Sequence, residues 1–440
     1  MASTPQGPQQ TASSEAALVR GIGFWALAAS VINNTVGGTI FALPSGLAKA
    51  MGPSAPLAFV LGALVFVPIA LCFSAAGSRI HATGGAYSYV TSAFGQFPGF
   101  LVAALLWISN VAADGGIAAA LADQLRKATP AFDHTWVRNG IIVAALAILA
   151  TINARGVKVG ARAVMVFATV KLMPLFALAT LGWFWVHPAN LHVAHLPDLT
   201  TVGGSMVLVI FAYSGMETAL LPSGEVADPS RVVPRATLAA IGLVVLLYVS
   251  LQAVAWGLVG PALAMSTAPL ATAAGAITPA LFGALILTAS LSQFGFLHND
   301  LLGSSRLLYA MGRDGYLPSA LARVTPTHRV PAVAIFVHAA IGCALGIAGD
   351  FAGLATVSGG ATCLVYLGVC AAAWWLQRRG VRGEGEPFRL HGGPMIPLIG
   401  CAGLLLVLST LQRNEWQAIG WSTLIVLAIY AVLRWNARRR

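Results

Sequence analysis

Long apolar stretches separated by short loops run through nearly the whole sequence. Of its 440 residues, 58% are hydrophobic and only 9% are charged. A soluble domain carries about 25% charged residues, so this chain has too few charges to cover a water-facing surface. Because about 20 mostly apolar residues cross a bilayer as one helix, the sequence predicts an all-α membrane protein. A soluble enzyme and a disordered chain are excluded.

The apolar stretches predict twelve transmembrane helices in a single domain, residues 20–440. They fall near 22–48, 55–77, 97–121, 137–154, 162–186, 201–221, 235–259, 276–300, 331–349, 353–376, 394–411 and 416–434. Residues 1–19 are rich in Ser, Gln, Pro and Ala and have no basic segment before an apolar core. We expect them to form a disordered cytosolic tail rather than a signal peptide.

The basic residues predict the orientation of the chain. With the tail in the cytosol, 19 of the 25 lysines and arginines lie in cytosolic loops, five lie outside and one lies within a span. Cytoplasmic loops carry this excess of basic residues. We therefore expect a multi-pass protein of the bacterial inner (plasma) membrane, with both termini cytoplasmic.

Two spans contain Gly, Ser, Thr and Asn at their centres, at 33–40 in the first and 211–217 in the sixth. A helix break in lipid is tolerated only where protein or a water-filled cavity surrounds it. Breaks five spans apart predict two halves of inverted topology, 20–186 and 200–376, with 394–434 as two accessory helices. The alternative is that these small residues only pack helices closely together.

Broken helices expose backbone N–H and C=O groups that could bind a zwitterion. Gly37 and Gly38 would let the backbone approach a carboxylate, and the carbonyls of Ser214 and Gly215 could accept an ammonium group. The aromatic side chain of Phe211 or Tyr213 could close over the substrate, although aromatic residues in spans are usually core or lipid contacts. The predicted substrate contacts are Asn34, Val36, Gly37, Gly38, Thr39, Asp114, Phe211, Tyr213, Ser214 and Gly215.

Four charged residues lie within or near predicted spans, where a charge is costly and by default functional. Burial disfavours the charged form of Lys171, so it could load and release a proton. It could equally hold the freed carbonyls of a broken span. Glu217, just after the second break, could be protonated reversibly or could cap the helix that follows. These two residues and Asp300 are the candidates for proton coupling or gating.

The two aspartates, Asp114 and Asp300, each allow more than one interpretation from the sequence. Asp114 has no basic residue within one helical turn, so it could bind a cationic substrate side chain. It could equally be protonated and silent, or be hydrogen-bonded to neighbouring helices. Asp300 could lie at depth, but we favour the cytosolic end of the eighth span.

No metal site, cofactor or nucleic-acid partner is expected. His187, His192 and His195 share one loop without a carboxylate or cysteine at ligand spacing. The five cysteines lie in apolar stretches without paired spacing, so they are expected to be packing thiols. No motif of an intramembrane enzyme is present.

Several motifs resemble the amino acid, polyamine and organocation transporter superfamily, most closely its bacterial arginine/agmatine antiporters. Residues 36–44 are similar to the family's first-span Gly-Ser-Gly pattern. The other matches are 83–89 with 94–95, 216–217 with 224–236, 304–318, which is the most specific, and 387–389.

The resemblance implies a five-plus-five inverted repeat (the LeuT-like fold) with helices 1 and 6 broken, and alternating access to a site between spans one, three, six, eight and ten. It assigns the gate to Phe211 and a pH-responsive role to Glu217. Lys171 resembles a lysine that replaces sodium in proton-coupled relatives. Asp114 takes the place of an Asn in the antiporters, and Asp300 takes roughly the place of an eighth-span Trp. A carboxylate at either place would favour a cationic amino acid or amine as the substrate.

We therefore predict a secondary active transporter, not an enzyme, that moves an amino acid or related amine by proton coupling or by exchange, as a monomer or homodimer. The alternatives are an amino acid sensor without transport and a channel, which would need a continuous polar pore.

Overall fold

The computed structural model describes residues 21–126, 134–193, 196–349, 351–409 and parts of 413–432. Within these residues the chain is helical, and its only β interaction is an isolated bridge between Ile22 and Val226. This confirms the all-α fold class. The predicted tail, 1–19, and much of the predicted twelfth span, 416–434, lie outside the described residues.

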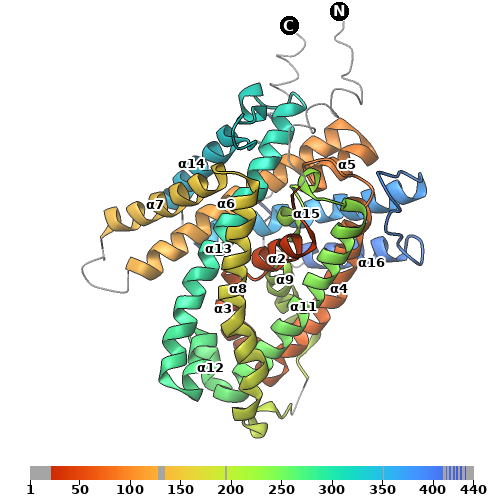
Figure 1. The fold of residues 1–440 in the computed structure, drawn as a ribbon. Coiled ribbons are helices and arrows are strands. Elements are labelled where there is room, and N and C mark those ends of the chain that lie inside the picture. Colours follow the sequence, from red (N-terminus) through yellow and green to blue (C-terminus); the bar gives the residue numbers. More distant parts are fainter. Residues whose placement is uncertain are drawn as a thin grey trace, which may run out of the picture.

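The helices follow the apolar stretches closely (Figure 1). In chain order they are α2 (Phe24–Thr35), α3 (Thr39–Met51), α4 (Ala55–Gly77), α5 (Ala86–Phe94), α6 (Gln96–Arg126), α7 (Thr135–Ala154), α8 (Val157–Leu181), α9 (Leu199–Tyr213), α10 (Met216–Ala219), α11 (Pro229–Val259), α12 (Pro269–Ile277), α13 (Pro279–Arg313), α14 (Ala332–Ala348), α15 (Phe351–Arg378) and α16 (Met395–Ser409). Short 3-10 helices are η1 (Gly52–Ser54), η3 (Gly182–Trp185), η4 (Pro188–Leu191), η5 (Ser223–Glu225), η6 (Gly260–Met265) and η7 (Ser319–Ala322).

Seven helices in the described part are long and apolar enough to cross a membrane. Two more, α14 and α16, are apolar but shorter. The broken first and sixth spans contribute further helices that are short because they are interrupted. The number of twelve spans stays a prediction.

Both predicted breaks are present. The first span stops at Thr35 and resumes at Thr39, and the sixth stops at Tyr213 and resumes at Met216. At the second break Gly215 has φ +125°, which side-chain-bearing residues rarely adopt. Polar and glycine residues therefore interrupt the helices where the sequence predicted it.

The broken helices lie in the interior of the helix bundle. In Figure 1, α2 and α9 lie at the centre and α16 lies at the edge. The helix α2 packs against α8, α11 and α13, and α9 packs against α3 and α4. Protein therefore surrounds both breaks, which is the condition for irregular backbone at membrane depth.

The position of Asp300 differs from our expectation. The eighth span was predicted to end near residue 300, but α13 continues to Arg313. Asp300 therefore lies within the helix, and its exposed fraction is 2%. The preference for the cytosolic end was wrong because the polar stretch after residue 300 remains helical and is buried against neighbouring helices.

Candidate functional site

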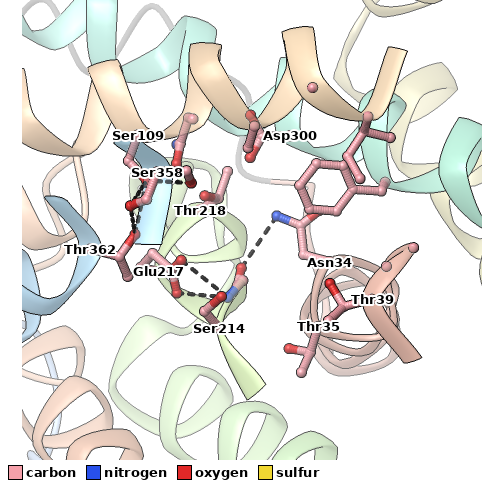
Figure 2. A pocket seen from close by; sticks show the side chains of 18 of the residues that line it. Asn34, Thr35, Thr39, Ser109, Ser214, Glu217, Thr218, Asp300, Ser358 and Thr362 are labelled. Atoms are coloured by element: carbon pink, nitrogen blue, oxygen red, sulfur yellow. Dashed lines mark hydrogen bonds between the residues drawn. The ribbon is translucent and has the colours of Figure 1, made fainter. Parts of the chain in front are cut away.

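The two helix breaks contact each other directly. The side-chain amide of Asn34, at the end of α2, donates a hydrogen bond of 3.2 Å to the backbone carbonyl of Gly215 (Figure 2). A Cβ atom at Gly215 would lie 2.8 Å from the backbone carbon of Asn34. Asn299 of α13 donates to the Asn34 side-chain oxygen over 2.9 Å and so orients the amide. A glycine is therefore required at this crossing.

The carbonyl groups freed at the end of α2 are bound by Lys171 of α8. Its ammonium group donates to the carbonyl oxygens of Asn33, at 2.6 Å, and Val36, at 2.5 Å. The Lys171 side chain is fully buried. Of the two roles that the sequence left open, this geometry is that of the tether, and Val36 contributes its carbonyl to Lys171 rather than to the wall of the pocket.

Two hydroxyl groups complete this arrangement. Ser292 of α13 donates to the carbonyls of Val36 and Gly37, at 3.0 and 3.1 Å. Tyr248 of α11 donates to the carbonyl of Thr35 over 2.8 Å. Three neighbouring helices thus supply the donors that a continuous helix would have supplied from its own backbone.

A pocket opens beside the two breaks (Figure 2). The N-terminus of α3 faces it, and its N-cap residue, Gly38, has no side chain that could cap the helix. The first N–H groups of a helix have no partner within the helix. The lining residues are Asn34, Thr35, Gly37, Gly38, Thr39, Ser109, Asn110, Ala113, Gly116, Ile117, Ser214, Gly215, Glu217, Thr218, Phe296, Asp300, Phe351, Ser358 and Thr362.

Glu217 is bonded to the break that precedes it. Both carboxylate oxygens accept from the N–H of Gly215, at 3.1 and 2.9 Å, as Figure 2 shows. Tyr366 of α15 donates to the same carboxylate over 2.5 Å. The predicted capping role agrees with this geometry, and the side chain also lines the pocket. Its protonation during transport stays a prediction.

Eight of the predicted site residues line the pocket together. They are Asn34, Gly37, Gly38, Thr39, Ser214, Gly215, Glu217 and Asp300. Their convergence from α2, α3, α10 and α13 is the arrangement that two facing breaks would produce.

The predicted aromatic gate is not formed by Tyr213. Its hydroxyl donates to the carbonyl of Phe59 over 2.9 Å, and its ring stacks on Tyr248 with centroids 5.6 Å apart. Tyr213 is thus a core residue. The side chain of Phe211 lies outside what the structure describes. Two aromatic residues that the sequence analysis missed, Phe296 and Phe351, line the pocket instead.

Asp114 also differs from our expectation, because it does not line the pocket. Its carboxylate lies 3.0 Å from Nε2 of His338, and both side chains are completely buried. We predicted that Asp114 contacts a substrate side chain, whereas in the structure it contacts His338. His338 was missed because nothing in the local pattern of α14 distinguishes it from a packing residue.

One side of the pocket is a hydroxyl network that the sequence analysis also missed. The Ser109 hydroxyl on α6 lies 2.9 Å from the Ser358 hydroxyl and 2.8 Å from the Thr362 hydroxyl on α15 (Figure 2). The spacing of Ser358 and Thr362 by four residues places them on one helical face, and was the available signal.

Residues 22–433 match the sequence model of the family described as amino acid permease. The chain belongs to the amino acid permease family. This permease is therefore a membrane protein of a transporter family.

Relatives with curated names agree with this assignment. The human "Large neutral amino acids transporter small subunit 2" is 28% identical over 73% of this chain and 64% of its own length. The "Branched-chain amino acid permease BcaP" of Lactococcus lactis subsp. cremoris is 26% identical over 92% of each chain. The mouse "Asc-type amino acid transporter 1" is 27% identical over 77% of this chain and 67% of its own. The match thus spans just under two thirds of the human relative. The resemblance to arginine/agmatine antiporters in particular stays a prediction.

Proposed function

We propose that this permease is a secondary active transporter that carries an amino acid across the membrane by alternating access. The observation that carries the proposal is that the N-terminus of α3, whose N-cap residue is a glycine, and the broken end of α9 face the same pocket. The N–H groups of the first favour a carboxylate, and the carbonyls of the second favour an ammonium group. The two ends together suit the head group of an amino acid.

The walls of the pocket suggest how a substrate side chain is accommodated. Ile117, Phe296 and Phe351 provide apolar surface, and the hydroxyl network on α6 and α15 provides polar surface. The curated relatives are named for large neutral and branched-chain amino acids. We propose an amino acid with a neutral side chain as the substrate, with a cationic amino acid or amine as the alternative that Asp300 would favour.

The hydrogen bonds of Lys171 indicate which ion drives transport. Its ammonium group already donates to the carbonyl oxygens of Asn33 and Val36, so these oxygens are not free to bind a small cation. We propose that transport is driven by protons or by exchange, without sodium. The inverted halves, 20–186 and 200–376, would move about this site, with both termini in the cytosol of a bacterial cell.

Counterflow tests the proposed function. Purified protein in liposomes that contain unlabelled amino acids should take up members of a panel of radiolabelled amino acids with saturation. Gly38→Trp should abolish the uptake, because a side chain at Gly38 meets Ile117 within 3.3 Å and extends into the pocket. Gly46→Trp is a matched control on the same helix, since nothing lies within 4 Å of its Cβ position.

Three other outcomes of this experiment would contradict the proposal. Uptake that survives Gly38→Trp would place the substrate elsewhere. Saturable binding without flux would indicate a sensor, and current without saturation would indicate a channel.

A further inference from the structure

Three buried ionisable side chains meet where α6, α13 and α14 pack together. They are Asp114, Asp300 and His338, whose exposed fractions are 0%, 2% and 0%. Nε2 of His338 lies 3.0 Å from Asp114 Oδ2, and one nitrogen or oxygen atom from each of the three lies within 4.8 Å of the others. We refer to these residues as the Asp-His cluster.

The hydrogen bonds of His338 define its protonation. The indole N–H of Trp107 donates to Nδ1 of His338 over 3.1 Å. An indole nitrogen is only a donor, so Nδ1 must carry a lone pair and Nε2 must carry the ring hydrogen. The ring is therefore neutral and donates to Asp114. Its Nε2 has no lone pair to offer a metal ion, which disfavours metal binding in this arrangement.

The charge of the cluster requires a proton. Two carboxylates in one buried site cannot both ionise without a compensating charge, and the cost is greater at membrane depth. No lysine or arginine in the described part of the chain forms an ion pair with Asp114 or Asp300. In addition, Asp114 Oδ1 is buried without a hydrogen-bond partner among the described residues. This oxygen is a place where the proton can reside or be accepted.

The other titratable groups nearby are engaged elsewhere. On α13, His298 lies 3.2 Å from the Asn153 amide of α7, and Arg306 is paired with Glu225. The thiol of Cys343 lies on the same helix as His338. The remaining groups on packed elements are Glu217, bonded to Gly215 and Tyr366; Lys171, bonded to α2 carbonyls; and Arg138 of α7, paired with Asp123.

Asp300 connects the cluster to the pocket. It lines the pocket wall, as Figure 2 shows, whereas Asp114 and His338 are not among the lining residues. The Ser304 hydroxyl donates to Asp300 over 3.0 Å, and the Asn110 amide, which also lines the pocket, donates to Ser304 over 2.8 Å. Water in the pocket can therefore exchange a proton with Asp300, while Asp114 is shielded.

We propose that Asp114, Asp300 and His338 form a proton-loading site of the transport cycle, separate from Lys171. The proposal rests on the proposed transport function. On loading, one proton passes from pocket water to a carboxylate oxygen of the Asp300–Asp114 pair. On release it returns to water when the pocket faces the other side, and the pair keeps one shared proton, so that the two carboxylates are never ionised together. His338 stays neutral and holds Asp114 in position, so that it is a positioning residue.

The test separates proton coupling from transport itself. Liposomes receive a radiolabelled mixture of common L-amino acids, once for counterflow without a pH gradient and once for accumulation with the interior alkaline. A pH-sensitive dye inside the liposomes reports proton entry. One proton coupled to a gradient of one pH unit can drive about tenfold accumulation, since that unit corresponds to about 1.4 kcal/mol.

Asp114→Asn is the decisive variant because it keeps the shape of the side chain and lies outside the pocket wall. We expect it to retain counterflow, to lose the gradient-driven accumulation and to lose the dye signal. Asp300→Asn should lose the last two as well. His298→Gln, a buried histidine on α13 outside the cluster, should behave as wild type.

Several results would overturn the proposal. Accumulation and dye signal at wild-type levels in Asp114→Asn would do so. Loss of counterflow in an Asp114→Asn protein that unfolds at the wild-type temperature would also do so, because the residue would then be needed for transport itself and not for proton coupling alone. A dye signal that requires added Mn²⁺ or disappears with a chelator would indicate a metal site. If wild-type protein shows no counterflow, the proposed function fails instead, which is a distinct result.

Discussion

The ammonium group of Lys171 donates to the carbonyl oxygen of Val36, at the break in the first span, over 2.5 Å. A residue 135 positions away in sequence thus supplies the donor that the interrupted helix lacks. The same group bonds Asn33 on the other side of the helix end. Lys171 therefore connects α8 to the part of the site that is proposed to bind substrate.

Replacing Lys171 tests this connection. Lys171→Ala leaves the carbonyls of Asn33 and Val36 without this donor, and an unsatisfied buried polar group costs about 1–3 kcal/mol. We expect a lower unfolding temperature and weaker counterflow. Thermal unfolding in detergent and liposome uptake measure the two effects. Gradient-driven accumulation that disappears while exchange remains would give Lys171 a proton role as well. Unchanged stability and unchanged accumulation would remove it from the mechanism.

Gly215→Ala should disrupt the contact between the breaks. The new Cβ would lie 2.8 Å from the backbone carbon of Asn34, and φ of +125° is strained for alanine. We expect loss of most counterflow, because residues in such backbone regions cost about 1–3 kcal/mol even before the clash. Gly242→Ala in α11 is the control, since nothing lies within 4 Å of its Cβ position. Equal activity of the two variants would argue against the observed crossing.

Ser292→Ala tests the hydroxyl that serves the α2 carbonyls. It removes the bonds to Val36 and Gly37, and a typical hydrogen bond contributes about 0.5–1.5 kcal/mol. We expect an apparent substrate affinity reduced by a few fold, about tenfold at most. Thr288→Val, one turn earlier on α13, removes a buried hydroxyl that donates to the carbonyl of Ala284 in the same helix. A similar loss in both variants would show that the helix, and not the break, is being perturbed.

The ion pair between Arg306 of α13 and Glu225 should be the most costly one to break. Its atoms lie 2.9 Å apart, and both side chains are completely buried. The Glu225 carbonyl also accepts from Gly21 and Ile22, so the pair anchors the start of the first span. Removing one partner of a buried pair costs about 3–5 kcal/mol.

Arg306→Met should therefore lower the unfolding temperature strongly. Arg382→Met, in an exposed pair with Glu386, should have little effect because such pairs contribute about 0–1 kcal/mol. Comparable melting curves for the two variants would contradict the assigned importance of the Arg306 pair.

Much of the site was predictable because its signals are local in sequence. Gly37, Gly38 and Gly215 mark the breaks by their residue type alone, and the depth of Lys171 follows from counting along an apolar span. The cytosolic placement of Asp300 was wrong for a related reason. A span was assumed to end where polar residues begin, although neighbouring helices cover those residues in the folded protein.

The sequence by itself determined that this chain crosses a membrane, belongs to a helical transporter class and interrupts its first and sixth spans. Only the tertiary structure decided which carbonyls Lys171 holds, and that Asp114 meets a histidine 224 residues away. Helical periodicity relates residues a few positions apart, whereas the choice of partner depends on which helix faces turn toward each other. Packing across the whole bundle decides which helix faces meet, and no short stretch of sequence specifies that packing.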